Sequence, residues 1–185
     1  MLEKRFLMLT ALILGTCFSA ATSFSQNPNK TPEIPDTKSG LRLSTKLDRE
    51  VCKLKDDPVL KITLTNVGTS PIALYKKMYW GYSASLTLIV RDASGKTVEP
   101  DTIYDAKDRP PFRIEDFKTI QPGESFEVDK AISLRNEGVV EAGAYKFTLF
   151  YQSPVLQSDA PEIPGVWVTE NGPLKSKSVT LQVIK

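Results

Sequence analysis

The chain has 185 residues, of which 24 are Lys or Arg and 22 are Asp or Glu, giving a formal net charge of +2. A charge so close to zero gives no general reason to expect nucleic acid or an anionic membrane as a partner. The chain contains no histidine, which excludes Ser-His-Asp and Cys-His catalytic groups and histidine-ligated metal centres. Catalysis would have to rely on carboxylates, lysine or tyrosine. We therefore expect a protein that is not an enzyme and has no catalytic residue, metal or cofactor.

The first 25 residues have the composition of a secretory signal peptide. Lys4 and Arg5 precede an apolar run over residues 6–18, and small residues follow up to Ser25. The run is too short to span a bilayer, which takes roughly 20 apolar residues. We expect cleavage after Ser25, no integral membrane segment in the cleaved chain, and export to the periplasm or the extracellular space.

Two alternatives remain for this segment. Cleavage after Ala21 or Ser23 is one, and a lipoprotein signal in which Cys17 becomes the lipidated first residue is the other. Ordinary cleavage leaves one cysteine, Cys52, and therefore no internal disulfide. We expect Cys52 to behave as a small buried apolar residue.

A flexible linker and one folded domain are expected after the signal peptide. Residues 26–40 are polar and rich in proline, which is typical of a linker. In residues 41–185, Leu60, Ile62 and Leu64 alternate with polar residues, which predicts a strand with one buried face. The same alternation recurs in residues 86–90, 126–128, 145–151 and 179–183. Short strands separated by Gly, Pro and Asn predict an all-β, antiparallel Ig-like sandwich of about seven to nine strands.

Two connections in this domain are long, at residues 100–116 and 152–176, and loops of that length are commonly functional or mobile. At most one helical turn is expected, within residues 131–140. The first loop and its flanks gather acidic residues, namely Glu99, Asp101, Asp105, Asp108, Glu115 and Asp116. We interpret them as a solvated group that pairs with Lys107, Arg109 and Arg113, rather than as a calcium site or a pair of hydrolase carboxylates.

The stretch YKKMYWGYS, residues 75–83, concentrates aromatic rings beside two lysines. In one interpretation Trp80 packs inward, like the buried tryptophan of an Ig sandwich, and the tyrosines cover a sheet edge. In the other interpretation the rings and lysines form a platform for a sugar or a peptide. The candidate ligand-binding residues are Tyr75, Lys77, Tyr79, Trp80 and Tyr82.

The run EAGAYKF, residues 141–147, resembles the acidic-x-Gly-x-Tyr-x-Cys run of immunoglobulin domains. In those domains a tyrosine corner ties the start of a strand to the preceding turn. Phe147 stands at the place of the disulfide cysteine. The resemblance implies structural roles for Gly143, Tyr145 and Phe147.

Turn motifs between about residues 60 and 151 also resemble those of small bacterial Ig-like domains, including intracellular-proteinase-inhibitor-like domains. The matching residues are Asn66, Pro71, Asp92–Lys96, Pro122–Glu124 and the pair Gly143 and Tyr145. The resemblance implies an Ig-like sandwich. Because every match is a turn, it specifies the fold better than the function.

These observations together predict a secreted, non-catalytic Ig-like domain that binds protein or glycan through its loops. The first alternative is a proteinase inhibitor that presents residues 100–116 or 152–176 to a protease cleft. The second alternative is a carboxylate-based hydrolase, which would need two carboxyl groups held at a fixed separation.

Overall fold

The computed structural model describes residues 40–81, 84–102, 111–170 and 172–185, all within the compact unit Ile34–Lys185. The expected signal peptide and nearly all of the expected linker lie outside these residues. No helix in the described part is long and apolar enough to cross a membrane. The elements in chain order are β1 (Leu41–Leu47), β2 (Val51–Lys53), β3 (Val59–Asn66), β4 (Ile72–Tyr75), β5 (Leu86–Arg91), η2 (Ile114–Asp116), β6 (Phe117–Ile120), β7 (Ser125–Ala131), β8 (Gly143–Tyr151), η3 (Gln157–Asp159), β9 (Leu174–Lys175) and β10 (Val179–Ile184).

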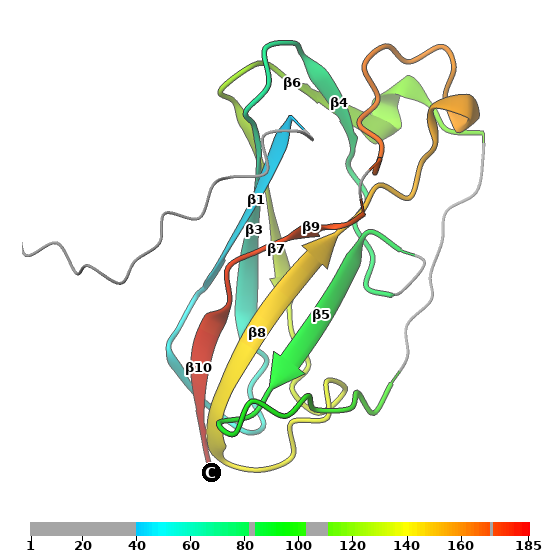
Figure 1. The fold of residues 1–185 in the computed structure, drawn as a ribbon. Helices are drawn as coiled ribbons and strands as arrows, with labels where there is room; N and C mark the ends of the chain where they lie inside the picture. The colour runs from blue at the N-terminus through cyan, green and yellow to red at the C-terminus, as the bar shows by residue number, and fades with distance from the viewer. Residues whose placement is uncertain (1–39, 82–83, 103–110, 171) are drawn as a thin grey trace, which may run out of the picture. The chain divides into compact units, whose positions relative to one another are not determined.

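Two sheets face each other across one main hydrophobic core (Figure 1). The first sheet has the order β1-β3-β7, and the second has the order β2-β10-β8-β5, with β9 paired to the end of β8. All neighbours are antiparallel except β2 and β10. The predicted all-β, antiparallel sandwich is therefore confirmed. Eight of the described strands have four residues or more, and β2 and β9 are shorter additions.

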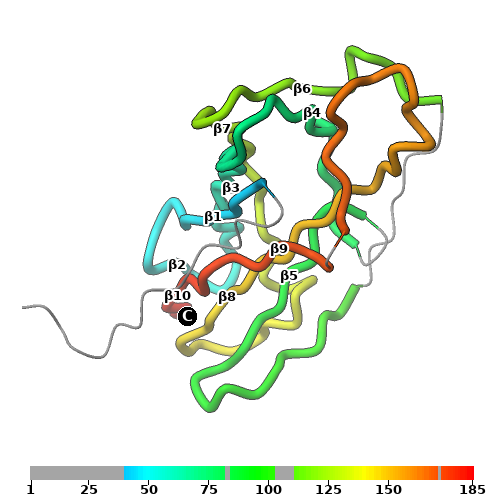
Figure 2. Tube along the Cα trace, turned by 45° about the horizontal axis from the view of Figure 1, so that its top comes forward, coloured from blue at the N-terminus to red at the C-terminus, as the bar shows by residue number. Residues whose placement is uncertain are grey.

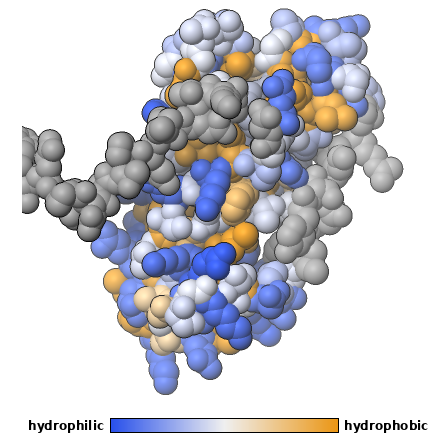
Figure 3. Space-filling view, viewed as in Figure 1, coloured by the Kyte–Doolittle hydropathy of each residue, from blue (hydrophilic) through white to orange (hydrophobic). Residues whose placement is uncertain are grey.

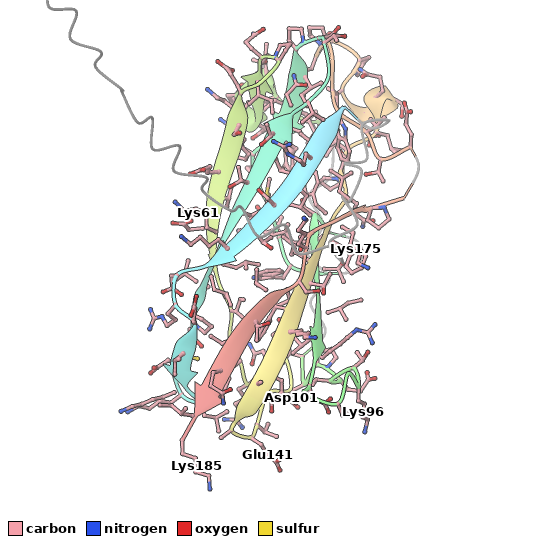
Figure 4. All side chains as sticks on the ribbon, turned by 60° about the vertical axis from the view of Figure 1, so that its left-hand side comes forward. Lys61, Lys96, Asp101, Glu141, Lys175 and Lys185 are labelled. Carbon is pink, nitrogen blue, oxygen red and sulfur yellow. The ribbon has the colours of Figure 1, made fainter. Side chains whose placement is uncertain are left out.

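Strand β3 shows how the alternating pattern fixes the register of the first sheet. Leu60, Ile62 and Leu64 are at most 1% exposed, and each fully buried side chain of this kind stabilises the fold by about 1.5–3 kcal/mol. Lys61 lies on the outer face, where its Nζ is 3.6 Å from Oε2 of Glu127 in β7 (Figure 4). A slip of one residue would turn the three apolar side chains into water, so the register is strongly specified.

Cys52 lies in β2, which pairs in parallel with β10 at the edge of the second sheet. Cys52 of β2 lies opposite Val183 of β10, and both side chains are buried. Burial raises the pKa of the Cys52 thiol. The side chain thus occupies a small apolar position, and the thiol is held in its protonated form.

Asn66 is a polar residue in a wholly buried position at the end of β3. Its side-chain amide donates hydrogen bonds to the backbone oxygens of Ser70 (2.9 Å) and Ile120 (3.0 Å). Its side-chain oxygen accepts a bond from the N–H of Gly68 at 2.9 Å. The asparagine thereby connects the end of β3 to the turn before β4 and to the end of β6. This explains why an Asn is suited to the end of this strand.

A second, smaller core lies beside the sandwich, under the long loops. Strands β4 and β6 pair with each other, and Ala73 of β4 also forms a parallel bridge with Val166 from the loop after β8 (Figure 2). The buried residues of this second core are Ala73, Tyr75, Phe117, Val155, Ala160, Ile163 and Val166, with Phe112 and Val168 packed against them. Much of the expected long loop at residues 152–176 therefore has a core of its own.

Tyr145 makes the hydrogen bond that defines a tyrosine corner. Its side chain is 8% exposed, and its hydroxyl donates to the backbone oxygen of Glu141 at 3.0 Å. Burial is the main reason why the pKa of Tyr145 is raised. Phe147, two residues further along β8, is 1% exposed and fills the core where an Ig cysteine would stand. Gly143 begins β8, beside the end of β10 (Figure 4).

Candidate functional site

The described part of the aromatic stretch, residues 75–81, does not place its rings on a single platform. Tyr75 ends β4, is 3% exposed and belongs to the second core. Its ring makes edge contacts with Phe112 and Phe117, at centroid distances of 5.3 and 5.6 Å. Edge contacts of this kind suit buried aromatic clusters. Tyr75 therefore packs under the loops and does not share a face with exposed residues.

The residues after Tyr75 leave the sheet and turn toward the main core. Met78 is 2% exposed, and Trp80 is half-buried against the same core. Trp80 forms a parallel bridge with Leu86 at the start of β5. Tyr79, at 37%, is exposed. Tyr82 lies outside the described residues. The backbone is not a continuous strand here, so its side chains do not alternate regularly between two faces.

Lys77 connects this stretch to the start of β6. Its Nζ lies 3.3 Å from Oδ1 of Asp116. The backbone N–H of Arg113, and less strongly the Lys77 ammonium, hold the pKa of Asp116 below its ordinary value. Lys77 therefore helps to hold the end of the first long loop, where Asp116 precedes β6.

The acidic residues around the first long loop are only partly described. Arg113 lies 3.5 Å from Glu115, and both are well exposed, so the pair contributes little to stability. Asp105, Asp108, Lys107 and Arg109 lie outside the described residues. Within the described part of the chain, no group of three acidic or other ligating side chains is arranged to hold a metal ion.

The most distinctive described surface is formed by the loops over the second core, and we call it the loop end. Ile114 of η2 is 72% exposed and Leu156, just before η3, is 62% exposed. Pro111, Pro161 and Pro164 are exposed beside them in the chain. Figure 3 shows apolar surface among these loops at the upper right. Ile114 and Leu156 were not among the residues that the sequence suggested.

Hydrogen bonds hold Leu156 in a defined position. The Leu156 N–H donates to the carboxylate of Asp159 at 3.1 Å. The Ser153 N–H donates to the Thr169 hydroxyl at 2.8 Å, which connects the two ends of the loop. Val155, the neighbour of Leu156, is fully buried in the second core. The loop thus has one apolar side chain as an anchor and presents the next one to solvent.

Glu137 is a partly buried carboxylate in the turn between β7 and β8. Its N–H donates to Ser133 at 3.1 Å, as in one turn of a helix. Burial raises the pKa of Glu137 to about 7. In the described part of the chain, no hydrogen bond or ion pair reaches its side chain. The backbone of Asp101 donates to Asn136 at 2.9 Å, so a neighbouring segment covers this turn.

Comparison with known proteins gives no family for this chain. No family model and no curated protein matches it. A β-glucosidase, EmGH1 of Erythrobacter marinus, matches 78% of this chain with a TM-score of 0.37 and 14% identity, but only 15% of its own chain is covered. The CARDB domain of the PF1109 protein of Pyrococcus furiosus, solved with di-metal ions, matches 77% of this chain and 91% of its own, with a TM-score of 0.35 and 14% identity. At these TM-scores the fold assignment rests on the sheets described above.

Proposed function

We propose that this chain is an exported, non-catalytic Ig-like domain that binds a protein partner through its loop end. The observation that supports the proposal is the exposure of Ile114 and Leu156 on loops that have their own core. Large apolar side chains held in place before binding lose little freedom when a partner covers them.

A protein partner agrees better with this surface than a glycan does. A sugar platform needs exposed ring faces, but Tyr75, Phe117 and Trp167 are all buried. Trp167 also stacks on Tyr151, with ring centroids 5.4 Å apart. Among the aromatic side chains in the described part of the chain, Tyr79 alone is exposed. Aliphatic and proline surface suits an apolar patch on another protein.

A carboxylate-based hydrolase receives less support. Such an enzyme uses two carboxyl groups, one of them with a raised pKa. Glu137 has the raised pKa, but within the described residues no second carboxylate is joined to it by a hydrogen bond. Its raised pKa follows from burial alone.

The proposal is tested by capturing partners from an envelope extract with the chain from Gln26 onward. The variant carries Ile114→Ser and Leu156→Ser, and we expect specific capture to fall by at least about tenfold, as for central apolar contacts. The matched control carries Val51→Ser and Val140→Ser, which change two exposed apolar residues on β2 and in the loop before β8. Equal losses in both variants, or no loss in either, would contradict the proposal.

Proteinase inhibition is a second candidate function, favoured by the position of Leu156. An inhibitor loop must be rigid and present an exposed side chain to the protease cleft. Leu156 is exposed between the buried Val155 and the η3 turn. Inhibition of a panel of proteases that cleave after apolar residues would support this function, provided that Leu156→Ser removes it and Ile114→Ser does not.

A further inference from the structure

The two sheets are closed on one side of the sandwich and open on the other. Strand β1 contacts β9 and β10, and the Thr45 hydroxyl donates to the backbone of Lys177 at 3.4 Å. Figure 4 is seen toward this closed side, with β7-β3-β1 on its left and β10-β8-β5 on its right. Strands β7 and β5 form the opposite side. No comparable set of contacts joins β7 to β5 in the described part of the chain.

The backbone of β7 has an unpaired edge on the open side. Just beyond the β3–β7 ladder, Ile132 donates to Pro58 and Asn66 donates to Glu124, both at 2.9 Å. Hydrogen-bonded pairs alternate in an antiparallel ladder, so even-numbered residues of β7 bond to β3. The odd-numbered residues direct their N–H and C=O groups outward, and they are Ser125, Glu127, Asp129 and Ala131. No backbone partner meets these groups within the described residues.

The inward side chains of β7 are also incompletely covered. Phe126 and Val128 pack against the main core but remain partly exposed, as does Leu88 of β5. Lys130 is the next inward residue, and its Nζ donates to the backbone oxygen of Met78. Burial lowers the pKa of Lys130, and no carboxylate forms an ion pair with it in the described part of the chain. A partly buried ammonium without an anion favours an acidic partner group.

We infer that β7 accepts an extended segment of a partner protein as an added strand, with a carboxylate of that segment paired to Lys130. The added strand would bond to the free backbone groups of β7, as in other cases of strand addition. Side chains directly opposite each other share one face. The segment would therefore place apolar residues opposite Phe126 and Val128, an acidic residue opposite Lys130, and basic residues opposite Glu127 and Asp129.

A capped peptide, Thr-Glu-Lys-Val-Lys-Val-Thr, has this pattern when it runs antiparallel to β7. We expect it to shift the amide NMR signals of β7 and to slow hydrogen exchange of the Glu127 and Asp129 amides by at least about tenfold. Methylation of the backbone nitrogens of its two lysine residues removes the peptide N–H groups that would bond to Glu127 and Asp129, and it should abolish binding. These effects are separate from the loop end, so the variant with Ile114→Ser and Leu156→Ser should bind the peptide normally.

The charge pairing is tested by replacing the peptide glutamate with glutamine. This peptide should bind the unaltered protein at least about tenfold more weakly. With Lys130→Met the two peptides should bind equally, whereas Lys46→Met, on the outer face of β1, should preserve the difference. No β7 shift at millimolar peptide, equal binding of both peptides to the unaltered protein, or amides of Glu127 and Asp129 already as protected as those of β3 would each overturn the inference.

Discussion

Asn66 satisfies three backbone groups with one buried side chain, so its removal affects several segments at once. Asn66→Ala would remove the side-chain hydrogen bonds to the Ser70 and Ile120 oxygens. It would also remove the bond from the Gly68 N–H, which would keep only its longer bond to the Gly40 oxygen at 3.2 Å. Unsatisfied buried groups cost about 1–3 kcal/mol each. We expect the free energy of unfolding in urea to fall by at least about 2 kcal/mol. Thr65→Ala, at the neighbouring position, is the control, and a similar small loss in both would contradict the assignment.

The tyrosine corner can be tested by removing one atom, the hydroxyl oxygen of Tyr145. Tyr145→Phe removes the hydroxyl that donates to Glu141 but keeps the ring in the core. Net hydrogen bonds of this kind contribute about 0.5–1.5 kcal/mol, so the melting temperature should decrease while partner capture is unchanged. Tyr79→Phe, at an exposed tyrosine, should leave the melting temperature the same. An unchanged value for Tyr145→Phe would show that the corner contributes nothing to stability.

At the scale of elements, the segment from Met78 to Trp80 covers part of the core, and its three side chains should differ in importance. Met78→Ala should cost about 2–5 kcal/mol, as for other buried large-to-small changes. Trp80→Ala should cost less than the roughly 3–5 kcal/mol of a fully buried aromatic, because Trp80 is half-buried. Tyr79→Ala should change stability by no more than about 0.5 kcal/mol. Chemical denaturation of the three variants measures this order, and a larger effect for Tyr79 would reverse it.

The main strands could be predicted because their signal is local. In β3 and β8 the alternation of apolar and polar residues directly reflects one buried face. The turns between strands are also local, since Gly95 and Gly123 adopt positive φ angles of 86° and 84° that favour glycine. The alternating apolar residues and the turn residues together were sufficient to predict the sandwich.

The smaller elements and the loop end could not be predicted in this way. Strand β2 has three residues, too few to show a period, and its pairing with β10 depends on residues far along the chain. The bridge between Ala73 and Val166 is similarly distant in sequence. Val155 is fully buried whereas Leu156 is 62% exposed, although both are apolar neighbours. Packing between distant segments decides which one faces solvent.

At the scale of the described unit, two cores have different roles. The main core lies between the two sheets and supplies most of the buried apolar side chains. The second core holds the loops that carry Ile114 and Leu156. The proposed binding through the loop end would leave the main core unaltered, and changes at exposed loop positions should affect affinity without large effects on stability.

The stability of this unit should also depend on pH through Glu137. The carboxyl has a pKa of about 7 when folded, compared with an ordinary value of 4.5. Between these values the folded chain keeps a proton that the unfolded chain has lost. The contribution of Glu137 to the free energy of unfolding is therefore largest below about pH 4.5, and it is lost as the pH rises to about 7. The limiting slope for one proton is about 1.4 kcal/mol per pH unit.

The aspartates with lowered pKa values, Asp48, Asp92 and Asp116, act in a different pH range from Glu137. The pKa values of Asp48 and Asp92 are lowered, mainly by hydrogen bonds from Arg49 and Ser94 respectively, so their contributions are lost only as pH falls below about 4. The chain has no histidine to titrate near pH 6. Denaturation between pH 5 and 7.5 should show a decrease in the free energy of unfolding that disappears in Glu137→Gln. Glu141→Gln, at an exposed position in the same connection, should retain the decrease, and a flat profile in the unaltered protein would show that water reaches the Glu137 carboxylate.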